Sequence, residues 1–269
     1  MVGLTRGFFE LMFKPLAYAC EEPGFVHHLN AQAPADQSRA ELFTMLYLTS
    51  LQFVTAHELG HHVHGHCEPS RNSSCCRRKE IVPAAAATDN LESQAAEIDA
   101  DGYSVFMTLA NLMKDGPRRT AAKLLGKADA PAECGPAILA AFLTSVSCFF
   151  HISQGPFDAK RISVRTHPFE LARLYFVVRH LRDWSAKYIP ELAAWPDSKD
   201  FWIVQDNVRA ALSTVIGDQN WSEQQQFLAS EPGKEYMHRL EATIPLVRSS
   251  MEPYKWEVLA EARESGASK

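Results

Sequence analysis

The sequence lacks a hydrophobic run that meets the requirements of a membrane span. Its strongest candidate, residues 137–150, is too short and contains hydroxyl side chains, so we expect it to form a buried core helix. Glu10 and Lys14 interrupt the apolar N-terminal stretch, which disfavours a signal peptide. These absences predict a soluble, cytoplasmic protein without a transmembrane segment.

A convincing disulfide framework and an excess of positive charge are also missing. Six cysteines are present, and two of them, Cys75 and Cys76, are adjacent, which is not typical of a disulfide-rich domain. We therefore expect a reducing environment such as the cytoplasm. The net charge of −5 argues against nucleic acid as a main partner.

Strand signals are sparse, whereas helical patterns recur along most of the 269 residues. The chain is 46% hydrophobic and can bury a sizeable core as one large domain or two small ones. We predict a mainly α fold with at most a small residual β-sheet. The patterns predict helices near residues 6–20, 38–65, 90–114, 119–126, 136–151, 168–187, 199–216, 222–230, 233–249 and 253–264, with long connections at 67–89 and 152–165.

The most informative motif is the pentapeptide His57-Glu58-Leu59-Gly60-His61. Two histidines four positions apart on a helix lie about 40° apart around the axis and roughly 6 Å apart along it, so both imidazoles can reach one metal ion. Zinc lowers the pKa of a bound water to about 7, and Glu58 can take a proton from that water. The apolar residues 42–56 indicate a buried helix; the alternative is an exposed histidine cluster.

A catalytic zinc site needs a third protein ligand, with water in the fourth position. In a continuous helix His64 would lie about 10 Å along the axis from His57, too far to complete the site unless the helix ends early. Glu97 and Asp101 are four residues apart, so on a helix both carboxylates face one way. We predict Glu97 as the ligand and Asp101 as a residue that orients a zinc histidine. The alternative is a helical first turn in which the helix dipole favours acids.

Three cysteines, Cys67, Cys75 and Cys76, could join His64 and His66 in a second metal site. Their spacing matches no common zinc-binding motif, so we do not predict such a site. Residues 67–89 join the two segments that carry the proposed ligands. This connection either borders or covers the cleft or is a disordered excursion.

These motifs resemble those of gluzincin metallopeptidases, with HELGH followed by His66 and then by Glu97-x-x-x-Asp101. The closest resemblance is to the HtpX, Oma and CaaX-prenyl-endopeptidase group. Thr166-His167-Pro168, with Arg173 five residues after the proline, resembles a third motif of that group. The resemblance covers about residues 1–185.

The resemblance implies a role for each matching residue. His57, His61 and Glu97 become zinc ligands, and Glu58 becomes the general base. His167, together with Arg173, is implied to stabilise the oxyanion or to position the peptide backbone.

The chain departs from that group in two respects. Many members are membrane-embedded, and a soluble member would be more similar to the Lit phage-exclusion type of intracellular peptidase. In the group, an edge strand before the HExxH helix can pair with an extended substrate. Residues 3–11 are similar to that strand-then-helix segment, but we expect the usual upstream sheet to be short or absent.

We predict a zinc metallopeptidase domain at residues 1–187 and a C-terminal helical extension at residues 188–269 packed on it. The extension carries no catalytic motif and either supports the catalytic domain or binds a regulatory partner. Apolar residues recur in it at helical spacing and are expected to lie in the core: Trp202, Val204, Val208, Leu212 and Val215.

The expected activity is endopeptidase hydrolysis of a protein or peptide substrate. One alternative is a zinc amidase that acts on a small molecule, which a deep, closed pocket would favour. Another is a non-catalytic, zinc-binding regulatory module. A fourth protein ligand such as His64 or a cysteine, in place of water, would favour that alternative.

Overall fold

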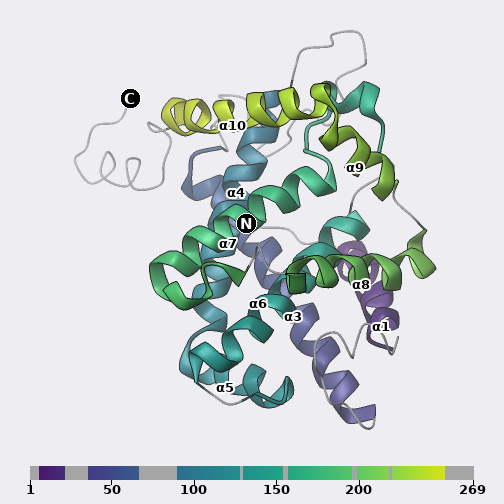
Figure 1. Cartoon of the computed structure of the whole chain (residues 1–269), viewed down its shortest axis with the longest axis vertical. Helices are drawn as coiled ribbons and strands as arrows, with labels where there is room; N and C mark the ends of the chain where they lie inside the picture. Colours follow the sequence, from purple (N-terminus) through teal and green to yellow (C-terminus); the bar gives the residue numbers. More distant parts are fainter. Residues whose placement is uncertain are drawn as a thin grey trace.

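Helices make up the regular structure in the part of the chain that can be described. The computed structural model describes residues 6–21, 36–66, 90–127, 130–153, 157–195, 199–217 and 220–251. Within these ranges no strand occurs, and the helices cross one another in several directions (Figure 1). The prediction of a mainly α fold is confirmed.

The helix boundaries agree with most of the expected ranges to within a few residues. The α-helices are α1 (Arg6–Glu21), α3 (Asp36–Val63), α4 (Leu91–Leu112), α5 (Asp115–Leu124), α6 (Pro131–Ser153), α7 (Glu170–Tyr188), α8 (Lys199–Ile216), α9 (Trp221–Ala229) and α10 (Glu231–Met251), and the short 3-10 helices are η1 (Ala159–Val164) and η2 (Pro190–Leu192). The predicted helix at 253–264 and the connection at 67–89 lie outside the described residues.

The apolar helix α6 is longer than the sequence pattern predicts. Its residues Glu133–Ser153 are long and apolar enough for a membrane span, so the expectation that this segment is too short for one was wrong. The helix begins before its apolar stretch because proline is tolerated, and an acid favoured, in a first helical turn. Within the protein, 83% of its most apolar window is buried, which confirms the predicted core helix.

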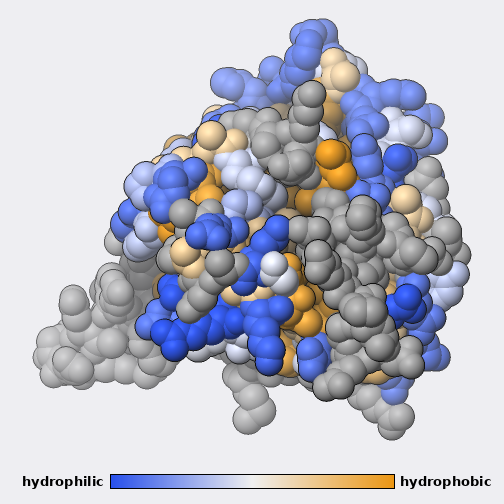
Figure 2. Space-filling model, turned by 60° about the horizontal axis from the view of Figure 1, so that its bottom comes forward, coloured by the Kyte–Doolittle hydropathy of each residue, from blue (hydrophilic) through white to orange (hydrophobic). Residues whose placement is uncertain are grey.

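Phe53 of α3 is a fully buried member of the larger apolar core. Its ring centroid lies 6.2 Å from that of Phe142, 6.2 Å from that of Phe149 and 5.8 Å from that of Phe150, all on α6. Phe53 is one helical turn before His57, so this packing fixes the stretch of α3 that carries the motif. On the face shown in Figure 2, hydrophilic residues surround smaller hydrophobic areas.

A second apolar core joins α4 to α10. Leu91, Ala95 and Ile98 of α4 pack there with Leu240 and Ile244 of α10. In Figure 1, α10 lies across α4 at the top of the molecule. The C-terminal part of the chain therefore covers the beginning of the helix that carries the predicted acids.

Helix α8 adds to the larger core, but not through every residue expected there. Val204, Val208 and Leu212 are buried, as predicted. Trp202 is 59% exposed, so its assignment to the core was wrong. It lies two positions from Val204, which is about 200° around the helix axis. The side chain of Val215 lies outside the described residues.

Both apolar cores combine residues from before and after residue 187. The predicted division into a catalytic domain at 1–187 and an extension at 188–269 stays a prediction.

Helices α3 and α4 approach closely where small residues meet. A Cβ added to Gly60 would lie 3.2 Å from the Cβ of Tyr103 and 3.3 Å from the Cα of Ala100. Both distances are shorter than an ordinary van der Waals contact, and the second neighbour is backbone that cannot rotate away. Glycine at this position therefore lets the histidine-bearing helix lie against the acid-bearing helix.

Candidate metal centre

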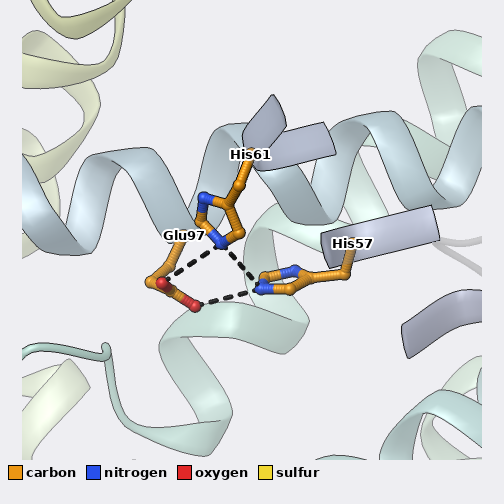
Figure 3. Close-up of side chains that lie close together, drawn as sticks. All are labelled: His57, His61 and Glu97. Atoms are coloured by element: carbon orange, nitrogen blue, oxygen red, sulfur yellow. Dashed lines mark hydrogen bonds and ion pairs between the residues drawn. The ribbon is translucent and has the colours of Figure 1, made fainter. Parts of the chain in front are cut away.

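The three predicted ligands meet between the end of α3 and the second turn of α4, as Figure 3 shows. Nε2 of His61 lies 3.0 Å from Nε2 of His57. The carboxylate oxygens of Glu97 lie 3.2 Å from Nε2 of His57 and 3.4 Å from Nε2 of His61. All three residues are buried.

This spacing fits a zinc ion. Zinc holds nitrogen and oxygen ligands at about 2.1 Å, so neighbouring ligands of a tetrahedral site lie about 3.4 Å apart. The three ligand atoms lie within 4.8 Å of one another and belong to two imidazoles and one carboxylate. That donor set is typical of catalytic zinc sites with three protein ligands.

The pKa values show how strongly these groups interact. Burial alone would lower the pKa of His57, but hydrogen bonds with Asp101 and Glu97 raise it to about 9. Burial alone would raise the pKa of Glu97, but hydrogen bonds from His57 and His61 hold it well below its ordinary value. Glu97 is thus an ionised carboxylate, and a metal ion would displace the proton of His57 on binding.

Asp101 lies behind His57 and is fully buried. Its Oδ1 lies 2.9 Å from Nδ1 of His57. Arg173 of α7 donates to the same carboxylate from Nε at 2.8 Å and from Nη2 at 2.6 Å. Burial would raise the pKa of Asp101, but the charge of Arg173 and the hydrogen bond with His57 lower it. The carboxylate therefore contacts the ring of His57, and its predicted role in orienting that ring for a metal ion stays a prediction.

Arg173 is itself held in a buried position. Its guanidinium group lies 4.1 Å above the ring centroid of Phe150, a residue of the larger core. The structure therefore places Arg173 on Asp101. The role in substrate or oxyanion positioning that the resemblance implies stays a prediction.

Glu58 lies on the exposed side of α3, next to the buried ligands. Burial alone would lower the pKa of Arg173, but the carboxylates of the centre, Asp101 first and Glu58 included, raise it. The charge of Glu58 therefore acts within the centre although its side chain is open to solvent.

His167 reaches the centre from the segment before α7. Its Nε2 lies 3.5 Å from Oε2 of Glu97, and its side chain is 44% exposed. A hydrogen bond of 2.8 Å joins its Nδ1 to Oγ1 of Thr166. One ring nitrogen thus faces the centre while the other is held by the preceding residue.

Gln94, which the sequence analysis missed, fixes the segment that carries His167. Its side-chain nitrogen donates to the carbonyl of Ile162 at 2.7 Å and to that of Arg165 at 2.9 Å. Its oxygen accepts a 2.6 Å hydrogen bond from the hydroxyl of Tyr236 on α10. The only sequence signal is a polar residue one turn before Glu97, which does not reveal a partner so distant in the chain.

Asp99, also missed, forms a second group with His64 and His66. Nδ1 of His64 lies 2.5 Å from Oδ2 of Asp99, and Nε2 of His66 lies 3.2 Å from it. His64 therefore does not belong to the group of His57, as the expected axial distance indicates. The three cysteines considered for a second metal site lie outside the described residues.

A protein-family model described as Peptidase U49 matches residues 13–193, which is more than half of the chain. The chain belongs to the peptidase U49 family. The matched region contains the pentapeptide motif, the Glu97–Asp101 motif and the Thr166–Arg173 segment. Membership supports a protease function and agrees with the Lit-like part of the predicted resemblance. Searches of curated proteins and of solved structures found no match.

Proposed function

We propose that this member of the peptidase U49 family is a zinc-dependent endopeptidase. The observation that carries the proposal is the buried group of His57, His61 and Glu97, with the donor set and spacing of a catalytic zinc site. Among the described residues, His64 belongs to a separate group. That position argues against His64 as a fourth ligand in place of water, which is one of the two replacements that would favour the non-catalytic alternative.

When bound, zinc lowers the pKa of a water molecule and polarises the scissile carbonyl. In the proposed mechanism Glu58 accepts the proton of the attacking water and delivers it to the leaving amine. His167 donates a hydrogen bond from Nε2 to the developing oxyanion, an interaction worth about 3 kcal/mol in comparable sites. Asp101 keeps the lone pair of His57 Nε2 directed into the centre.

The exposure of the two proposed catalytic groups favours a peptide substrate. Glu58 is exposed and the side chain of His167 is 44% exposed, whereas the ligands behind them are buried. An extended peptide can reach both groups from solvent. A zinc amidase for a small molecule would be expected to enclose these groups in a deep pocket.

The substitution Glu58→Gln tests the mechanism. We expect the variant to bind zinc as the parent does and to lose at least about 100-fold in the rate of peptide cleavage, because glutamine cannot accept the proton. Zinc content is measured by elemental mass spectrometry, and cleavage by mass spectrometry of a mixed peptide library.

The matched control is Glu41→Gln, an exposed position on the same helix about 25 Å along the axis from Glu58. It should cleave the library as the parent does. Normal turnover by Glu58→Gln would contradict the mechanism, and a zinc content that Glu97→Ala leaves unchanged would contradict the ligand assignment.

A further inference from the structure

The two proposed zinc histidines use different partners for their Nδ1 atoms. His57 contacts the carboxylate of Asp101 directly. Nδ1 of His61 lies instead 3.0 Å from Nδ1 of His66, and Nε2 of His66 lies 3.2 Å from Oδ2 of Asp99. A chain of contacts from His61 through His66 to Asp99 therefore runs behind the second histidine.

The backbone at the end of α3 brings His66 into this position. The amide of His66 donates to the carbonyl of His61 at 2.8 Å, and the amide of Gly65 donates to that of His62 at 3.2 Å. Together they form a Schellman motif, in which the residue that follows the helix end must adopt the left-handed backbone conformation. Gly65 has φ of 80°, so glycine supplies that conformation without strain.

Asp99 is held as a buried carboxylate by groups from two other segments. Besides His64 and His66, Arg248 of α10 donates from Nε to Oδ1 of Asp99. Burial would raise the pKa of Asp99, but the hydrogen bond from His64 and the charge of Arg248 keep it well below its ordinary value. The contact with His66 is electrostatic, since Nε2 does not point along a hydrogen-bond direction.

The tautomers of the two histidines follow from both ends of the chain of contacts. A metal ion on Nε2 of His61 requires a lone pair there, so the proton of the neutral ring must lie on Nδ1. At the other end, Nε2 of His66 lies 3.2 Å from Oδ2 of Asp99, and this negative oxygen favours the ring form with its proton on Nε2. Nδ1 of His66 therefore carries a lone pair and accepts the hydrogen bond from Nδ1 of His61.

The same assignment argues against a second metal site on Nε2 of His66. The side chains of His64, His66 and Asp99 offer ligand atoms within 4.8 Å of one another. A second ion on Nε2 of His66 would force its proton onto Nδ1. Two Nδ1–H groups, from His61 and His66, would then face each other at 3.0 Å with no acceptor between them.

We propose that His66, backed by Asp99, is a positioning residue that holds the ring of His61 with its Nε2 directed into the centre, and that Arg248 connects this support to α10. The role in metal binding rests on the proposed function. The contacts from His61 through His66 to Asp99 are present without a metal ion, so the support of the His61 ring can be measured independently. Arg248 forms an ion pair with Asp99 from α10, a helix that lies beyond the residues matched by the family model. The proposed support of His61 therefore includes a residue from outside the matched region.

The first experiment measures the ring ¹⁵N shifts of His61 in the metal-free, ¹⁵N-labelled full chain by long-range ¹H–¹⁵N correlation. We expect the Nδ1 signal of His61 to differ between the parent and His66→Ala, because the 3.0 Å contact with Nδ1 of His66 is lost. His66→Asn should restore the parent signal, because the asparagine side chain can make a hydrogen bond where Nδ1 did. Equal Nδ1 signals in the parent and His66→Ala would overturn the proposal.

The second experiment measures zinc affinity by competition with a chelating dye. Loss of such a support typically costs about 10- to 100-fold in metal affinity, so we expect that loss in His66→Ala and its recovery in His66→Asn. Circular dichroism of the metal-free variants checks that the helices are retained. A loss in His66→Asn as large as in His66→Ala would assign the effect to packing and overturn the proposal.

Zinc stoichiometry separates this proposal from the alternatives. One ion per parent chain, retained in His64→Ala, supports it. Two ions per chain, of which His64→Ala loses one, would overturn it in favour of a second metal site. If the parent binds no zinc, the proposed function fails, and the ¹⁵N experiment alone decides whether His66 supports the ring of His61.

Arg248→Gln tests the connection to α10. Arg248 has a side chain that is 51% exposed, so its replacement leaves no buried cavity. We expect about a 10-fold loss of zinc affinity, since the carboxylate of Asp99 is no longer held from α10. Arg239→Gln, at an exposed position of the same helix, is the matched control and should bind zinc as the parent does. Equal zinc affinities of Arg248→Gln and Arg239→Gln would overturn the proposed connection to α10.

Discussion

The buried carboxylate of Asp101 contacts two buried basic side chains of the centre, those of Arg173 and His57. It accepts two hydrogen bonds from Arg173 and contacts Nδ1 of His57, and no part of it is exposed. Removing one partner of such a buried pair leaves the other charge without compensation, which costs far more than the pair contributes when intact. The stability of the metal-free protein should therefore depend on this residue.

The substitution Asp101→Asn is expected to lower the free energy of unfolding of the metal-free protein by about 3–5 kcal/mol, because the charge of Arg173 stays buried. Urea unfolding followed by circular dichroism measures the loss. Asp115→Asn is the control: the side chain of Asp115 is 79% exposed, so its charge is solvated in the ion pair with Arg118 and the loss there should stay below about 1 kcal/mol. Similar losses for both would contradict the argument.

At the scale of single residues, the sequence predicts those site residues whose positions follow from local helical spacing. His57, His61 and Glu97 were predicted from helical periodicity, and the structure brings them together. Asp99 was not predicted, although it lies between Glu97 and Asp101. Its partners depend on where α3 ends and on how α10 crosses α4, and neither is encoded in the spacing around Asp99.

Two helices of this chain end in the same way, which allows a comparison at the scale of elements. Gly65 ends α3 and Gly126 ends α5, with φ of 80° and 63°. Both ends have the two backbone hydrogen bonds of the Schellman motif; for α5 these are Gly126 to Lys123 at 3.2 Å and Lys127 to Ala122 at 2.8 Å. Only the first of the two returns a histidine to the metal centre.

Gly65→Ala and Gly126→Ala should each lower the free energy of unfolding by about 1–2 kcal/mol, because alanine is strained in the left-handed conformation. Only Gly65→Ala should also weaken zinc binding, since it displaces His66 from His61. Thermal unfolding and dye competition measure the two effects. Unchanged zinc affinity in Gly65→Ala would show that the conformation at the end of α3 does not affect metal binding.

Element boundaries could be predicted where composition marks them and less well where tertiary contacts decide. The end of α3 followed from the change in pattern before residue 67, whereas the early start of α6 at Pro131 did not, because the first turn of α6 is less apolar than its middle. The exposed Trp202 shows the same limit: a 3.6-residue repeat identifies a buried stripe, but a large apolar residue off that stripe remains at the surface.

On the scale of the whole molecule, the candidate metal centre lies where both apolar cores meet. Phe53, one turn before His57, belongs to the larger core, and Ile98, next to Glu97, belongs to the smaller one. An ion held by α3 and α4 would therefore bind the folded chain and not the unfolded one. Metal binding should add to global stability.

We expect zinc at about 100 times its dissociation constant to stabilise the parent by about 2.7 kcal/mol, which raises the melting temperature by roughly 5–10 °C. A chelator should reverse the shift. The Glu97→Gln variant should show a much smaller response, because it lacks one ligand. Differential scanning calorimetry measures all three, and an equal shift in Glu97→Gln would place the stabilising ion elsewhere.

The three buried acids of α4 also bear on the order in which the chain folds. Before α3, α7 and α10 arrive, Glu97, Asp99 and Asp101 repel one another and keep this stretch hydrated. We therefore expect α4 to dock late, after the aromatic residues of α3 and α6 have assembled. Stopped-flow kinetics should show that Asp101→Asn speeds unfolding and leaves the refolding rate nearly unchanged, whereas Phe53→Leu slows refolding. A chain that folds in this order brings its metal ligands together only after the other helices have reached their native packing.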